Sequence, residues 1–221
     1  MFKLDLIDLP KLVRIDGEIR TYQTPTGQVY PSVTTVLSKT KDMTHLNAWR
    51  KRIGHDKAEA ITRKASTRGT ATHLLCEKLV LNQEFDLRQE IPISVHLFKQ
   101  LQKFLVANVN DVRVSEGSLF SHKLKVAGSV DLIASYRNLP AIIDFKTSTK
   151  YKRLEWVEDY FMQAAMYSYM FWEMTQMYHP KLIIAIGVEE ENEPQIFEQD
   201  VNDWISKASK RCKQFHRENI L

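Results

Sequence analysis

Two oppositely charged side chains interrupt an apolar stretch, AIIDFKTST, at residues 141–149. Asp144 and Lys146 are two positions apart, so in a strand they share one face while Phe145 points to the other. A further aspartate, Asp131, lies within the preceding apolar stretch VAGSVDLIASY. We expect neighbouring strands to place Asp131, Asp144 and Lys146 together on one side of a sheet.

Two crowded carboxylates repel each other, and a bound cation removes that repulsion. Hard ions that prefer oxygen ligands, Mg²⁺ or Mn²⁺, suit such a pair, as one ion or two. A lysine beside them can orient metal-bound water or stabilise charge that develops on a phosphate. The alternative is an exposed ion pair between Asp144 and Lys146, which would contribute little. Asp131 favours a site, because a buried carboxylate needs a partner.

Composition sets limits on the class of protein. With 221 residues, 43% of them hydrophobic, the chain suits one compact domain with a sizeable core. A net charge of +4 allows a polyanionic partner without requiring one. The two cysteines, without a CxxC pair, argue against a zinc site, an iron–sulfur cluster or a disulfide scaffold. We see no signal peptide, transit peptide or membrane-spanning run, and we therefore expect a soluble, cytoplasmic protein.

The hydrophobic periodicity predicts a hairpin or short meander followed by helices, three strands, a helix and two more strands. This order indicates a mixed α/β sheet with one antiparallel meander and one crossover. We expect the long helix at 55–82 to be kinked near residues 66–69. The predicted elements are a hairpin at 13–30, helices at 32–40, 43–54, 55–82, 94–109, 154–176 and 201–219, and strands at 112–122, 124–136, 140–148, 181–188 and 195–200.

Several motifs resemble those of one nuclease superfamily. GSVDLI, followed by IIDFKTS, resembles the D…(D/E)-x-K signature of the PD-(D/E)XK nucleases, with thirteen positions from Asp131 to Asp144. RGTATHLLCE resembles the helix that carries a histidine in the RecB-like branch, and QAAMY resembles its Q-x-x-x-Y motif. YPSVTTVLS is similar to the mitochondrial genome maintenance exonuclease group and its phage and bacterial relatives. One departure is Val130, which stands where the superfamily name has proline.

The resemblance implies a nuclease core in which helices flank a central mixed β-sheet in αβββαβ order. An N-terminal hairpin and a basic helical segment that arches over the site would precede this core. We therefore expect a single nuclease domain over residues 1–221, with the hairpin and arch in 1–70 and the catalytic core in 71–221.

The resemblance also implies roles for individual residues. Lys146 would position the attacking water or stabilise the phosphate, with Gln163 and Tyr167 as further catalytic residues. Tyr167 could equally be packing material in an apolar helix. The metal ligands would be His73, Asp131, Asp144, the carbonyl of Phe145 and, in addition, Glu116. Taken alone, His73 is typical of a core or surface histidine, and Glu116 of a solvated strand end.

Basic and hydroxyl residues on either side of these motifs suit a path for DNA phosphates. Trp49, Phe98 and Phe104 could add stacking surfaces, although aromatic residues at helical spacing are usually core. The predicted DNA-binding residues are Arg50, Arg52, Arg63, Arg68, Thr147, Ser148 and Lys150.

We therefore expect a Mg²⁺- or Mn²⁺-dependent DNA exonuclease that acts on free, preferably single-stranded ends in replication, recombination or repair. It would work in a bacterial or phage-infected cell, with a single-strand-binding or recombination protein as a possible partner. No phosphate-binding G-x-x-x-x-G-K-[ST] loop is present, so no ATP is expected. The alternatives are a structure-specific or restriction-type endonuclease, a non-catalytic nucleic-acid-binding module and a structural subunit. Oligomeric state does not follow from the sequence.

Overall fold

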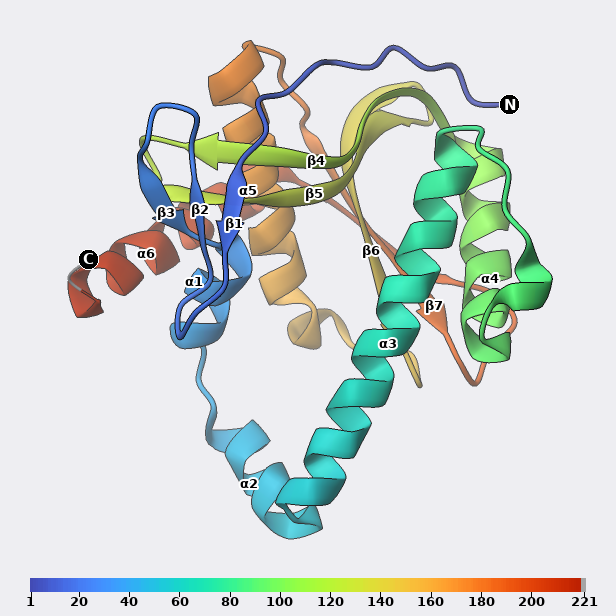
Figure 1. Cartoon of the computed structure of the whole chain (residues 1–221), viewed down its shortest axis with the longest axis horizontal. Helices are drawn as coiled ribbons and strands as arrows, with labels where there is room; N and C mark the ends of the chain where they lie inside the picture. The colour runs from blue at the N-terminus through green and yellow to red at the C-terminus, as the bar shows by residue number, and fades with distance from the viewer. Residues whose placement is uncertain (220–221) are drawn as a thin grey trace.

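The computed structural model describes residues 1–219, and it is an α/β fold built on two sheets (Figure 1). The larger sheet has five strands in the order β4-β5-β6-β7-β8. The smaller has three, in the order β1-β2-β3. The strands are β1 (Val13–Ile15), β2 (Thr21–Gln23), β3 (Val29–Pro31), β4 (Val109–Ser121), β5 (Val126–Tyr136), β6 (Leu139–Ser148), β7 (Lys181–Val188) and β8 (Gln195–Asp200). The helices are α1 (Val33–Lys39), α2 (Thr44–Ile53), α3 (His55–Val80), α4 (Pro92–Asn108), α5 (Glu158–Thr175) and α6 (Val201–Glu218), with 3₁₀ turns at Leu87–Gln89 and Leu154–Trp156.

The five-stranded sheet has the mixed topology that the sequence predicts. β4, β5 and β6 form an antiparallel meander, and α5 then carries the chain across to β7, which pairs parallel to β6. β8 returns antiparallel to β7. β7 and β8 have the bounds predicted for them, because each is a short apolar or alternating run between clear turn residues.

Helices cover both faces of this sheet (Figure 1). On one face, residues of α5 and α6 such as Phe161 and Phe215 pack with Ile142 of β6. On the other face, Phe98 of α4 and Leu75 of α3 pack in a second cluster. All five of these side chains are fully buried, so the sheet is the rigid centre of the fold.

The N-terminal segment is tied to the sheet. Its three-stranded sheet leads into α1, whose first turn is capped by the hydroxyl of Ser32, which accepts a hydrogen bond from the Thr35 amide at 3.0 Å. Ser32 also forms a parallel bridge with Ala127 of β5. This cap and bridge place the start of the helical region beside the strand that carries Asp131.

We call residues 44–68 the arch, because α2 and the first part of α3 project from the body of the molecule (Figure 1). α2 has no buried residue, and α3 begins directly after Gly54, whose φ of 87° lets the chain reverse. α3 is one uninterrupted helix of 26 residues, so the helix is not broken near residues 66–69, where a kink is predicted. It contains no proline, and Gly69 faces Thr147 of β6 at an ordinary contact distance. The expected division at residue 70 falls inside this helix.

Within residues 1–219, none of the helices combines the length and apolar character that a bilayer span requires.

Candidate active site

Strands β5 and β6 separate at the two aspartates. Their backbone pairing runs from Tyr136↔Leu139 to Leu132↔Ile143 and ends there. Beyond it, the Asp131 carboxylate accepts a hydrogen bond from the backbone amide of Phe145, at 2.7 Å. β6 continues in pairing with β7 as far as Ser148. The side chain of Asp131 therefore takes the place of a strand partner and opens a gap in the sheet beside Asp144.

The backbone is also distorted where Glu116 lies opposite Asp131. Glu116 has a left-handed φ of 50°, and a Cβ on Gly117 would fall 2.1 Å from Val114 Cγ1. The alternation of faces shifts across this position. Val130 and Ile133 pack in the same core cluster although they are three residues apart. Simple alternation, which would place Asp131 on the same face as Ile133, therefore does not hold at this point.

Glu116, Asp131 and His73 form a cluster that can hold a cation. One ligand atom from each lies within 4.8 Å of the other two. His73 comes from α3, with its Nδ1 3.6 Å from an Asp131 oxygen and its ring edge-on to Phe145. Both His73 and Glu116 are among the predicted metal ligands, and the structure brings them together with Asp131.

The three groups of this cluster shift one another's pKa values. Burial raises the pKa of Glu116 to about 7, and the charge of Asp131 adds to the rise. Burial opposes charge on His73 as well, but the Asp131 carboxylate outweighs it and raises the His73 pKa. For Asp131 itself, burial is outweighed by His73, and its pKa is lowered. Two carboxylates and an imidazole whose ligand atoms lie within 4.8 Å of one another are a donor set that a divalent cation would satisfy.

Asp144 and Lys146 form a buried ion pair next to this cluster. Asp144 is only 1% exposed and its Oδ2 contacts the Lys146 ammonium. Burial raises the Asp144 pKa to about 6, with the Asp131 charge adding to the effect and Lys146 opposing it. Its Oδ1 is buried and accepts no hydrogen bond from the described residues. An orphaned carboxylate oxygen at this place fits a cation ligand.

Lys146 is held from several sides. Burial opposes its charge, but Asp144 and Asp131 outweigh burial and raise its pKa. Its Nζ donates to the Phe145 carbonyl at 3.3 Å and lies 5.1 Å from the centre of the Tyr160 ring. Tyr160 is a neighbour that the sequence analysis did not single out, and its position one turn before Gln163 is the signal that could have identified it.

Gln163 and Tyr167 are one turn apart on α5 and contact each other. Gln163 Nε2 donates to the Tyr167 hydroxyl at 3.3 Å. Tyr167 is 3% exposed and its ring lies against Gly128, where a Cβ would come within 3.0 Å of it. Burial raises the Tyr167 pKa above its usual range, so the hydroxyl stays neutral. Among the described residues, no hydrogen bond joins this pair to Asp144 or Lys146.

The predicted DNA-binding residues lie in two places, on helices α2 and α3 and at the end of strand β6. Arg50, Arg52 and Arg63 are exposed on the arch. Arg68 instead forms an ion pair with Glu189 at 2.6 Å. It is five residues from His73, which on a helix is about 140° around the axis, so it faces away from the cluster.

Arg68 and Arg63 both line a separate cavity of about 490 Å³ between α3 and the start of α4. Beyond Lys146, Ser148 is buried and donates to the Lys150 carbonyl at 2.7 Å. Thr147 faces Gly69 of α3, and Lys150 is exposed, with its ammonium 3.5 Å from Glu190. Of the three predicted residues at the end of β6, Lys150 is the one most open to a phosphate.

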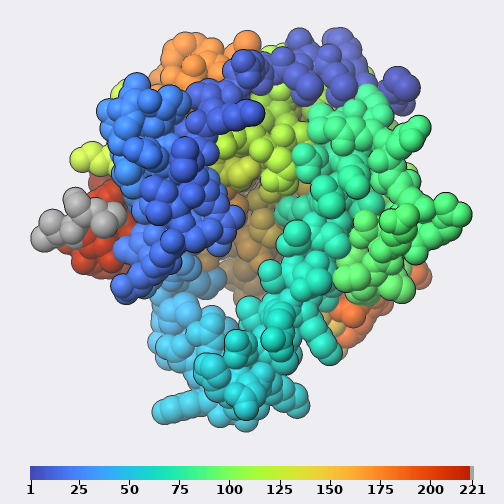
Figure 2. Space-filling model, viewed as in Figure 1, coloured from blue at the N-terminus to red at the C-terminus, as the bar shows by residue number. Residues whose placement is uncertain are grey.

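A hollow lies over the cluster. Gly69, Thr70, Leu74 and Glu77 of α3 line it together with His73 and Glu116, and its volume is about 530 Å³. Figure 2 shows a recess between the N-terminal strands and α3, and an opening between the arch and the core. Because the chain from α1 through α2 to α3 bounds this opening, it has the form of a closed ring.

Comparison with known proteins gives three kinds of match. A family model described as the PD-(D/E)XK nuclease superfamily matches residues 35–220. The curated protein "Mitochondrial genome maintenance exonuclease 1" is similar in two species. The Xenopus tropicalis protein is 29% identical over 55% of this chain and 37% of its own length. The human protein is 27% identical over 56% of this chain and 38% of its own length. These alignments thus span well under half of each relative.

A solved structure titled "Crystal structure of SSO0001" is 19% identical, covers 57% of each chain and has a TM-score of 0.35.

Proposed function

The chain belongs to the PD-(D/E)XK nuclease superfamily, and from this premise we propose that it is a metal-dependent exonuclease that hydrolyses single-stranded DNA from free ends. The observation that carries the proposal is the meeting of His73, Glu116 and Asp131 with the buried Asp144–Lys146 pair where β5 and β6 separate. The two curated relatives named above are exonucleases by their names, which supports the same activity here.

Residues of the chain would hold the metal and the phosphate. His73, Asp131, Asp144, Glu116 and the Phe145 carbonyl are the proposed ligands for Mg²⁺ or Mn²⁺. When bound, the ion would supply a Lewis acid and a water of lowered pKa for attack on phosphorus.

Lys146 would act as a fixed positive charge. Its raised pKa keeps it protonated at neutral pH, so it is unsuited to take a proton from water. Its role would be to orient the attacking water and to balance negative charge on the phosphate as the bond breaks. Tyr160 and Asp144 would keep the ammonium in place, while the neutral Gln163–Tyr167 pair would support this side of the site from α5.

The arch supports action at ends. A strand that passes through a closed opening can enter only by its end, and Arg50, Arg52 and Arg63 line the arch with positive charge. Roles in DNA replication, recombination or repair, in the cytoplasm of a bacterial or phage-infected cell, belong to the same proposal. A single-strand-binding or recombination protein is the partner we would test for.

Digestion of end-labelled linear and of circular single-stranded DNA, with Mg²⁺ or Mn²⁺, tests the proposal. We expect linear strands to shorten and circles to persist, and Lys146→Ala to lose activity by roughly 100-fold or more. Nicked circles would replace the exonuclease proposal with an endonuclease. No cleavage of either substrate, together with retained binding, would point to a nucleic-acid-binding module. Absence of any stabilisation by Mn²⁺ would argue for a structural subunit.

A further inference from the structure

The segment that follows the catalytic strand exposes three large apolar side chains. Tyr151 is 47% exposed, Leu154 43% and Trp156 59%. They lie between the end of β6 at Ser148 and the start of α5 at Glu158, only a few residues beyond Lys146. Two of the aromatic residues considered from the sequence as stacking surfaces, Phe98 and Phe104, are buried instead. The exposed aromatic rings of this region are therefore in a segment that the sequence analysis left aside.

These side chains are presented by a segment that is held in place. Lys152 donates its backbone amide to Gln195 Oε1 at 2.7 Å, and Gln195 Nε2 donates back to the Lys152 carbonyl at 2.8 Å. The 3₁₀ turn at Leu154–Trp156 closes with the Trp156 amide donating to the Arg153 carbonyl at 3.0 Å. Val157, next to Trp156, is fully buried. A ligand that contacts Trp156 would thus find a backbone that is already ordered, which lowers the entropic cost of binding.

The charge of the segment indicates the kind of ligand. Within residues 149–157, Lys150, Lys152 and Arg153 outnumber the single acid, Glu155, although Glu190 from the turn after β7 lies 3.5 Å from the Lys150 ammonium. The Arg153 guanidinium lies 5.5 Å from the centre of the Trp156 ring, so a cation and an aromatic face are offered together. Phosphates and bases alternate along a single strand of nucleic acid, so the phosphate can pair with the cation and the base can stack on the ring.

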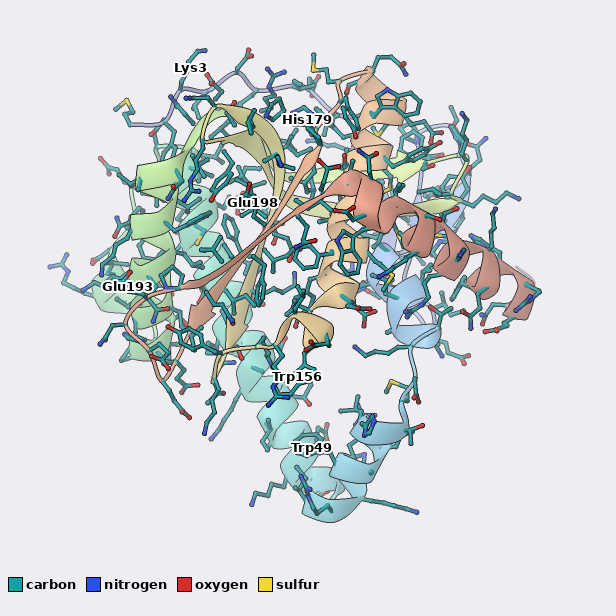
Figure 3. All side chains as sticks on the ribbon, turned by 180° about the vertical axis from the view of Figure 1, so that it is seen from behind. Lys3, Trp49, Trp156, His179, Glu193 and Glu198 are labelled. Atoms are coloured by element: carbon teal, nitrogen blue, oxygen red, sulfur yellow. The ribbon has the colours of Figure 1, made fainter. Side chains whose placement is uncertain are left out.

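The place of Trp156 relates it to the opening. The hollow over the metal-binding cluster is visible from the front (Figure 2). Seen from behind, Trp156 is at the border of the core and lies above Trp49 of the arch (Figure 3). In this view Trp156 therefore lies at the edge of the core nearest the arch.

We propose that Trp156 and Tyr151 form a stacking platform for unpaired nucleobases of a single strand that passes through the opening, with Arg153 and Lys150 contacting its phosphates. This inference rests on the proposed function, because it assumes that the strand being cut is the one that crosses the arch. Stacking has no strong preference for one base, so the platform would add affinity without adding sequence specificity.

The test compares two ligands of equal charge. One is a fluorescein-labelled oligothymidylate, and the other is an abasic deoxyribose-phosphate oligomer of the same length. Binding is measured by anisotropy in EDTA, so that no cleavage occurs. We expect Trp156→Ala to weaken oligothymidylate binding by about 5- to 150-fold, as the loss of one stacked base predicts, and to leave the abasic oligomer unchanged. Trp156→Phe should retain most of the wild-type affinity for oligothymidylate.

Tyr178→Ala is the matched control, because Tyr178 is 51% exposed but follows the far end of α5. α5 is about 27 Å long, so this ring is remote from Trp156. Thermal unfolding of each variant checks that it is folded.

Two outcomes would overturn the platform while the nuclease proposal stands. In one, wild type cuts and binds single strands and Trp156→Ala does the same, which would leave the exposed rings to a protein partner. In the other, Trp156→Ala weakens both oligomers equally. If wild type neither binds nor cuts single strands, the proposed function itself fails.

Discussion

The candidate site and the arch differ in how far their charged side chains are exposed to water. Asp144 is almost completely buried against Lys146, whose side chain is 21% exposed, and burial is the main cause that raises the Asp144 pKa to about 6. Apart from Arg68, which is paired with Glu189, the arch exposes its arginines to water, and α2 has no buried residue. A buried charge depends on one partner at one distance, whereas exposed charges act as a group and are screened by salt. The first arrangement suits chemistry at a point, and the second suits attraction of a polyanion.

The largest expected effect follows from breaking the buried pair. Lys146→Met keeps the aliphatic stem but leaves Asp144 buried without its cation. We expect the free energy of unfolding in EDTA to fall by about 3–5 kcal/mol, measured by urea denaturation. The control is Lys51→Met on the exposed surface of α2, which should change stability by less than about 0.5 kcal/mol.

The contrast predicts recovery when the second charge is also removed. Lys146→Met combined with Asp144→Asn should regain much of the lost stability, because the uncompensated carboxylate is then gone. If Lys146→Met and Lys51→Met cost the same, the two regions do not differ as described.

An intermediate effect is expected from neutralising the arch. The triple variant Arg50→Ala, Arg52→Ala and Arg63→Ala should leave the rate of the bound complex close to wild type and weaken single-strand binding. If each arginine contacts one phosphate, the slope of log affinity against log salt should fall by about 2. Anisotropy titrations at several salt concentrations measure this slope.

Arg68→Ala is the informative comparison for the arch. Arg68 is paired with Glu189 on the outer face of α3, so its removal should alter the salt slope much less than removal of a single exposed arginine. A full reduction in slope for Arg68→Ala would mean that DNA follows the outer face of the helix.

The smallest effect concerns a buried histidine outside the site. His179 is 2% exposed, its Nε2 is without a hydrogen bond among the described residues, and burial lowers its pKa from 6.5 to about 4. The unfolded chain therefore takes up a proton at higher pH than the folded chain does. Stability from the neutral ring is present above about pH 6.5 and is lost as pH falls towards 4.

We accordingly expect wild type to lose stability between pH 7 and pH 5 more steeply than His179→Phe, by thermal unfolding in matched buffers. His55→Gln, on the arch where the ring is 87% exposed, is the control. Identical pH dependence in wild type and His179→Phe would show that His179 does not contribute.

Local pattern was sufficient for much of the fold. The meander, the crossover helix and the mixed sheet follow from runs of alternating or continuous apolar residues that end at turn residues, and β7 and β8 start and stop at the residues predicted for them. The family could also be identified, because each of its motifs is a short local pattern and the motifs follow one another in a recognisable order along the chain. A cap such as Ser32 is a local feature of the same kind, since it involves only the next helical turn.

Tertiary structure decided what depends on distant neighbours. The face on which Asp131 lies could not be read from alternation, because the backbone is distorted at Glu116 and Asp131, in two different strands at once. The direction of Arg68 depends on where Glu189 is placed, 121 residues further along the chain. The exposure of Trp156 likewise depends on Gln195 fixing its segment. Sequence specifies which residues are capable of chemistry, but only packing brings residues from distant segments together and sets which of them are desolvated.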